Sequence, residues 1–250
     1  MSDKNDEKDT LGTTLIKSIY DPHLSEIIQD YGEIAIDALI QNDLLKEIPI
    51  IGTAVGFTKM GIAIRDRNFL KKILLFIQEF ETITAKEKES LLNKINEDEK
   101  FQERVGETLI LLLDRFDHFA KPKMLAQLFN GYLGGEIDYD KFQRLSTSVD
   151  RAFMPDLERL LSYYSKNTTP YQRGLTEKGY IWENLFPSGL SKIDPNISVD
   201  HEYGVVALSK RYGKPEDLIN YAPNSYAETF ARIILGDKYY MSFLTNTKGQ

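Results

Sequence analysis

The sequence predicts a mainly α-helical protein, with a helical body at residues 15–166 and a small winged-helix-like α+β domain at residues 170–244. Apolar residues recur every three or four positions through the first two thirds of the chain, which is the period of one helix face. After residues 167–170 (Asn-Thr-Thr-Pro), short strand-like segments separated by turn residues replace that pattern. Residues 1–14 begin with MSDKNDEKDT, and we expect them to form a disordered tail.

Composition and charge narrow the class of protein. The 250 residues are 42% hydrophobic and 28% charged, which is ordinary for a globular chain. The absence of cysteine excludes disulfides and Cys-ligated metal sites. The polar start of the chain lacks the apolar core of a signal peptide, so we expect a cytoplasmic, bacterial protein. Residues 1–165 carry 21 Lys and Arg against 29 Asp and Glu, and an acidic surface of this kind repels nucleic-acid phosphates.

Apolar stripes at helical spacing predict the helices of the body. The stripe from Phe101 to Phe119 indicates one long helix, which we expect to end at Lys121-Pro122, because proline disfavours a helical residue before it. Gly134-Gly135 is expected to close the next helix. The expected helices are residues 23–41, 68–81, 84–95, 101–119, 124–132, 138–153 and 155–166.

Capping residues support three of these helix starts. Thr84 and Glu87 form a capping box, in which a hydroxyl and a carboxylate bond exposed backbone amides. Asp138 is a good N-cap, and Pro155 fits the first turn of the following helix.

The C-terminal part is expected to alternate between helices and strands. Ser225 and Glu228 repeat the capping box before a last helix. Trp182 and Phe186 are expected in the core of the small domain. The expected order is a helix at 176–186, a turn at 187–189, a strand at 190–193, strands at 203–208 and 218–221, and a helix from 225.

A glycine-punctuated apolar run at residues 48–64 departs most from ordinary soluble-helix composition. It is too short and too polar at Lys59 to span a bilayer well, since about 20 apolar residues are needed. A buried core helix or hairpin, a self-association or peripheral membrane surface, and insertion after a conformational change remain alternatives. We expect close packing or self-association through Gly52, Val55, Gly56, Phe57 and Gly61.

A candidate polar site consists of Asp114, Asp117 and His118, which the long-helix prediction places on one turn. Asp114 and His118 would then be an i,i+4 pair able to bind a metal or transfer a proton, although such pairs are commonly surface ion pairs. The other histidines, His23 and His201, are distant in sequence. We therefore expect no metal, no cofactor and no catalytic residue.

The expected helix at 176–186 is a poor DNA reader, because residues 177–186 hold one Lys against two Glu. Lys210, Arg211 and Lys214 form only a small basic spot. A winged-helix shape used for protein contact is thus favoured over one used for DNA.

Four segments resemble uncharacterised bacterial helical proteins of the abortive-infection alpha type: 48–52 (IPIIG), 105–114 (VGETLILLLD), 137–142 (IDYDKF) and 221–230 (YAPNSYAETF). The similarity covers residues 40–236 and implies a helical body followed by a small winged-helix-like end. It also implies a role in phage defence, with no catalytic residue to carry over. We expect a non-enzymatic antiviral protein acting through protein–protein contacts or as a homo-oligomer; a winged-helix DNA-binding regulator is the alternative.

Overall fold

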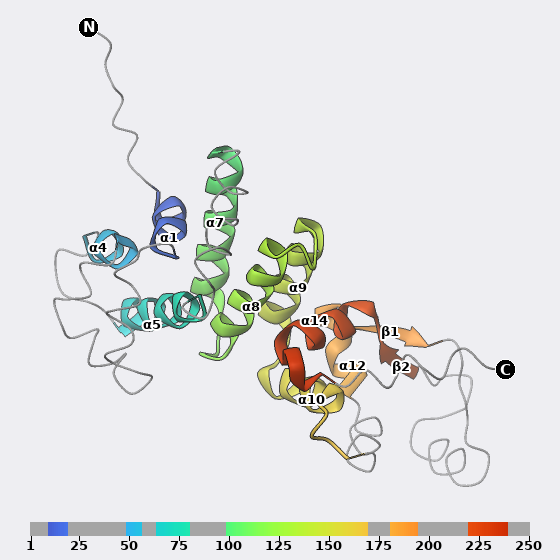
Figure 1. Ribbon diagram of the computed structural model, residues 1–250. Helices are drawn as coiled ribbons and strands as arrows, with labels where there is room; N and C mark the ends of the chain where they lie inside the picture. Colours follow the sequence, from blue (N-terminus) through green and yellow to red (C-terminus); the bar gives the residue numbers. More distant parts are fainter. Residues whose placement is uncertain are drawn as a thin grey trace, which may run out of the picture. The chain divides into compact units, whose positions relative to one another are not determined.

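Helices make up most of the computed structural model, which describes residues 10–19, 49–56, 64–80, 99–169, 181–194 and 220–239 (Figure 1). A two-stranded antiparallel sheet near the C-terminus is the one sheet in these ranges. The predicted mainly α-helical class with a small α+β appendage is therefore confirmed. The chain divides into two compact units, Met1–Ser146 and Thr147–Gln250, and each is described by itself.

The first unit begins at helix α1 (Leu11–Ile19), which starts inside the expected disordered tail. The tail prediction is therefore wrong for residues 11–14. Thr10 opens the helix, because its side-chain oxygen accepts a hydrogen bond from the Thr13 amide. Apolar side chains of α1 are almost completely buried, which gives this short helix the tertiary support that nine residues need in water. They are Leu15, Ile16 and Ile19.

Helix α1 packs on helix α7 (Glu99–Arg115) at a pair of glycines, Gly12 and Gly106. A Cβ atom at Gly12 would lie 2.6 Å from the backbone nitrogen of Glu107. One at Gly106 would overlap the backbone carbonyl of Gly12. The two helix backbones thus touch, and any side chain at either position would force them apart.

Helix α4 (Pro49–Gly56) lies beside α1 (Figure 1). The hydroxyl oxygen of Ser18 accepts a hydrogen bond from the Ile50 amide at 3.0 Å, which satisfies an amide in the first turn of α4. Ser18 also donates to the Thr14 carbonyl oxygen. Ile50 and Ile51 are buried, so this part of the apolar run contributes to the core.

An aromatic cluster forms the other core of the first unit. It joins α5 (Ile64–Gln78), α8 (Lys121–Leu133) and the start of α9 (Tyr139–Arg151). Gly134 and Gly135 end α8, with Gly135 at φ +79°, and the Asp138 carboxylate accepts from the Lys141 amide at the start of α9. Both were predicted from sequence. The rings in contact are Phe76, Phe80, Phe129, Tyr132, Tyr139 and Phe142, together with Phe101 of the helix at Glu99–Arg115.

The second unit is built on α10 (Met154–Tyr164), with Pro155 in its first turn as expected. Helices α12 (Ile181–Leu185) and α14 (Ser225–Leu235) pack against α10. Because α10 belongs to this core, the units divide at Ser146 and not after residue 166. The Tyr163 ring contacts the Trp182 ring, and Tyr164 stacks on Tyr239. Burial raises the pKa of the Tyr164 hydroxyl, with Glu228 adding to the effect.

The sheet pairs β1 (Ser191–Asp194) with β2 (Asn220–Pro223). Strands were expected at nearly these places. A short 3₁₀ turn, Phe186–Ser188, and Gly189 at φ +81° lead from α12 into β1. The register sets Ser191 against Pro223, Lys192 against Ala222, Ile193 against Tyr221 and Asp194 against Asn220.

Asn224 ties the sheet to α14. Its Oδ1 accepts from the Tyr226 and Ala227 amides, and its Nδ2 donates to the carbonyl oxygens of Gly189 and Ser191. The predicted capping box at Ser225 is therefore wrong, because Asn224 is the N-cap. Asparagine suits this position because its Nδ2 has two protons for the two carbonyl oxygens while its Oδ1 accepts from the helix amides, whereas a serine hydroxyl has one proton to donate.

Three predicted elements lie outside the described residues. They are the helices at 23–41 and 84–95 and the strand at 203–208.

We expect Gly106→Ala to destabilise the first unit. Alanine in a helix normally gains about 1 kcal/mol over glycine, but here its Cβ overlaps backbone atoms of α1, and overpacking costs about 1–3 kcal/mol. Urea unfolding followed by circular dichroism measures the change. The control is Gly134→Ala, where the backbone is helical and a Cβ would lie 3.2 Å from the Asn130 carbonyl oxygen. A Gly106→Ala protein as stable as wild type would contradict the close crossing.

Candidate functional site

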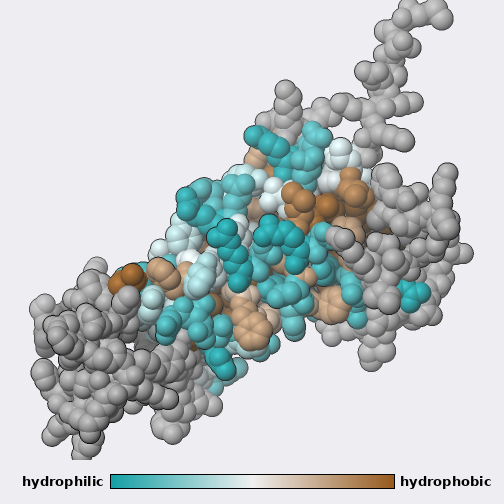
Figure 2. All heavy atoms as spheres, turned by 180° about the vertical axis from the view of Figure 1, so that it is seen from behind, coloured by the Kyte–Doolittle hydropathy of each residue, from teal (hydrophilic) through white to brown (hydrophobic). Residues whose placement is uncertain are grey.

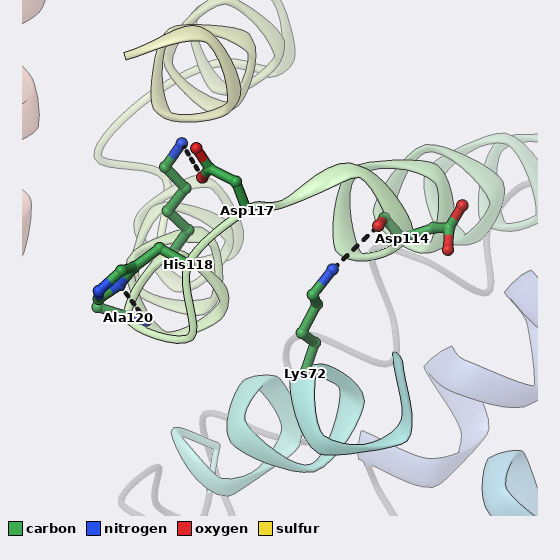
Figure 3. Close-up of polar contacts among 6 residues, drawn as sticks. Lys72, Asp114, Asp117, His118 and Ala120 are labelled. Atoms are coloured by element: carbon green, nitrogen blue, oxygen red, sulfur yellow. Dashed lines mark hydrogen bonds and ion pairs between the residues drawn. The ribbon is translucent and has the colours of Figure 1, made fainter. Parts of the chain in front are cut away.

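The connection between α7 and α8 contains two of the three candidate polar residues. Helix α7 ends at Arg115, so the predicted helix through residue 119 is wrong. Lys121 and Pro122 begin α8 instead of ending α7, because proline fits a helix's first turn. Asp117 and His118 therefore lie in the connection, so Asp114 and His118 do not share a helical turn. In Figure 3 the Asp114 carboxylate points away from both of the other residues.

Lys72 binds the C-terminal end of α7. Its ammonium donates to the Asp114 carbonyl oxygen at 3.0 Å (Figure 3). A cation at this place offsets the negative end of the helix dipole.

A buried cation anchors the start of α8. The Lys121 side chain is 0% exposed, and its Nζ lies 2.6 Å from Oδ1 of Asp117, whose side chain is 65% exposed. Burial opposes the charged form of Asp117, but the hydrogen bond and positive charge of Lys121 outweigh it and hold the pKa of Asp117 below its ordinary 3.8. The pair therefore balances a charge that would be costly to bury alone.

His118 acts as a local cap in this connection. Its Nδ1 accepts a hydrogen bond from the Ala120 amide at 3.1 Å, and its carbonyl oxygen accepts from the Lys121 amide. Because Nδ1 accepts, the neutral ring carries its proton on Nε2.

A small cavity of about 180 Å³ lies between α5 and the α7–α8 connection. It combines polar groups with two phenyl rings, and the Lys71 ammonium lies 4.9 Å from the centre of the Phe119 ring. The lining residues are Asn68, Lys72, Phe116, Asp117, His118 and Phe119.

The structure describes only some residues of the glycine-punctuated run at 48–64. Gly52, Val55 and Gly56 lie in α4, whereas Phe57 and Gly61 lie outside the described residues. Their expected role in packing or self-association stays a prediction. Among the described helices, none is long and apolar enough to cross a membrane. In the same ranges no three His, Cys, Asp or Glu side chains gather to hold a metal ion.

An exposed apolar surface in the second unit was missed by sequence reasoning. Ile193 is 52% exposed and faces Tyr221 across the sheet, so both lie on one sheet face. The Phe186 ring is 42% exposed, and its centre lies 5.2 Å from that of Tyr221. We call these three residues the Phe186 surface. Figure 2 shows hydrophobic atoms reaching the surface at separate places among hydrophilic ones.

The core prediction is confirmed for Trp182, which is buried, and wrong for Phe186. Helix α12 ends at Leu185, and the 3₁₀ turn at Pro187 directs Phe186 out of the core. A proline directly after an apolar helix end was the sequence signal for this change.

Helix α12 uses its apolar side to build the second core. Ile181, Trp182 and Leu185 are buried, and Glu183 and Asn184 are exposed. Across the described part of the second unit, acidic and basic residues are mixed along the chain.

Comparisons with protein-family models, with curated proteins and with solved structures gave no match for this chain.

We expect Asp117→Asn to destabilise the protein at pH 7 by about 1 kcal/mol, because Lys121 loses its negative partner and Asp117 itself is well solvated. The folded pKa of Asp117 is lowered, so its stabilisation is present above pH 3.8 and is lost as the pH falls through the lower folded value. The difference from wild type should shrink there. Urea unfolding at pH 7 and at pH 2–4 provides the measurement.

Asp140→Asn is the matched control, since Asp140 pairs with Arg144 and both side chains are largely exposed. Its cost should be at most about 0.5 kcal/mol. Equal costs for the two variants would show that the burial of Lys121 adds nothing to the pair.

Proposed function

We propose that this protein acts through contacts with other proteins, as a cytoplasmic phage-defence protein of the abortive-infection or toxin type. The Phe186 surface is the observation that supports contact as its mode of action. The defence role rests on the resemblance of residues 40–236 to abortive-infection alpha proteins.

The Phe186 surface has the composition of an interface centre. Aromatic and large aliphatic side chains dominate binding energy at protein interfaces, and single exposed residues elsewhere are ordinary. Fully burying one such side chain contributes about 1.5–3 kcal/mol, and Phe186 and Ile193 each still expose about half of theirs. A partner that covers both would gain a few kcal/mol from them. Polar rim contacts would supply the remainder of an interface of roughly 1,000 Å² or more.

DNA binding is the competing function, and the charges of the second unit weigh against it. The exposed residues of α12 are Glu183 and Asn184, and mixed charges attract a phosphate backbone weakly. A DNA-binding regulator would need its cations on one face.

Phage protection by the double variant Phe186→Gln/Ile193→Thr tests the proposal. Threonine keeps the β-propensity of residue 193, and both changes remove apolar surface. We expect wild type to reduce phage plating. The reduction given by the double variant should be at least about tenfold smaller, since two central contacts are removed.

Phe153→Gln is the control, because Phe153 is 66% exposed, lies in the same unit and is outside the Phe186 surface. Thermal melting confirms that each variant is folded. A double variant that protects as well as wild type would exclude the Phe186 surface as the contact site.

A wild-type protein that gives no protection against a broad phage panel would remove the defence role. Binding to plasmid-length DNA at about 50 mM salt that survives about 150 mM salt would favour the regulator instead.

A further inference from the structure

Residues 236–239, which follow α14, return to the end of α10, and we call them the strap. The strap begins as a 3₁₀ turn. The Lys166 amide donates to the Lys238 carbonyl oxygen at 2.8 Å, and Ser165 forms an isolated antiparallel bridge with Tyr239. The strap therefore joins the ends of two helices, α10 and α14, that pack side by side in the second unit (Figure 1).

A ring stack also joins the strap to α10. The rings of Tyr239 and Tyr164 are nearly parallel, at 20°, and their centres are 5.8 Å apart. Tyr164 is only 2% exposed, whereas Tyr239 is half-buried. Tyr163 meets the Tyr164 ring edge-on and contacts Trp182 in turn. The strap thus covers one side of a ring that belongs to the aromatic core of this unit.

Gly236 gives the strap a hinge. Its φ of +49° and ψ of −122° form a backbone conformation that residues with a side chain rarely adopt. Nothing lies within 4 Å of the place where its Cβ would be, so glycine is needed there for its conformation and not for space. Hinges are positions at the ends of elements that absorb a change in φ and ψ, which is the place that Gly236 occupies after α14.

Helix α14 and the strap are held with unequal strength. Ala227, Phe230 and Ala231 are completely buried, which anchors α14 in the second unit. Residues 236–238 are exposed, so the strap contributes little buried apolar surface before Tyr239. Segments with few buried apolar contacts open at a lower free energy than the core. The strap can therefore open while α14 stays in place.

We propose that the strap is a latch of the second unit, which opens about Gly236 without global unfolding. In the closed form it covers one side of the Tyr164 ring and accepts the hydrogen bond of the Lys166 amide. In the open form that side of the ring and that amide face solvent. The latch is separate from the Phe186 surface and does not depend on the proposed function.

Native-state hydrogen exchange of the full chain tests the latch. The Lys166 amide reports opening, because its partner is the Lys238 carbonyl oxygen of the strap. It should exchange at least about tenfold faster than the amides of Leu160 in α10 and Ala231 in α14. Its rate should change little with low concentrations of urea, since a local opening exposes little surface.

Two substitutions should open the latch. Tyr239→Ala removes the ring stack, and Gly236→Ala strains the closed form, because an L residue is disfavoured at φ +49°. Each should speed exchange of the Lys166 amide about tenfold and leave Leu160 and Ala231 nearly unchanged. In Gly236→Ala, a soluble nitroxide should also broaden the Tyr164 ring signals more than it does in wild type.

Tyr226→Ala is the matched control. Tyr226 is half-buried in the same unit and lies at the opposite end of α14 from the strap. This variant should leave the exchange rate of the Lys166 amide unchanged.

A Lys166 amide that exchanges together with Leu160 and Ala231 would overturn the inference, because the strap would then open only with global unfolding. Equal acceleration of all three amides in Tyr239→Ala would make Tyr239 an ordinary core residue. An unchanged Lys166 rate in Gly236→Ala would exclude the hinge.

Discussion

The crossing of α1 over α7 at Gly12 and Gly106 is the contact on which the first unit depends. A nine-residue helix does not persist alone in water, so α1 exists because it buries its apolar face against a neighbour. The glycines bring the two backbones into contact, which lets Leu15, Ile16 and Ile19 reach full burial. Helix α4 then depends on α1, because Ser18 accepts the hydrogen bond of the Ile50 amide.

The other end of α7 is organised by charge. Lys72 closes the helix from α5, and the buried Lys121 opens α8 in partnership with Asp117. The Lys72 contact satisfies one of the carbonyl groups that α7 exposes where it ends at Arg115, and the Asp117 carboxylate balances the buried charge of Lys121. The same break leaves the small cavity over α5, so this cavity is a consequence of where α7 ends and α8 begins.

Local signals predicted the fold class and most of the described helices. The stripe of α5, the Gly134-Gly135 ending and the Asp138 cap are all encoded within a few residues. The break after Arg115 was not predictable in this way, because Phe116 and Phe119 continue the apolar stripe of α7 while serving the cavity wall.

Contacts between residues that are distant in sequence could not be predicted from local sequence patterns either. Nothing near Gly12 in sequence identifies Gly106 as its neighbour, because the two glycines are distant in the chain and meet only in the fold. Asn224, and not Ser225, is the N-cap of α14, because its side-chain amide also bonds the carbonyl oxygens of Gly189 and Ser191, which are distant in sequence. For the candidate polar site, sequence identified the residue types, and the geometry separated Asp114 from Asp117 and His118.

Hydrogen exchange of the α1 amides tests the central claim most directly. If α1 is fixed to α7 at the glycine crossing, the amides of residues 15–19 should open only when the first unit unfolds. Their protection should then lie within about tenfold of that of residues 109–113 in α7. Exchange of the α1 amides at nearly the rate of an unstructured peptide, beside a protected α7, would contradict the account.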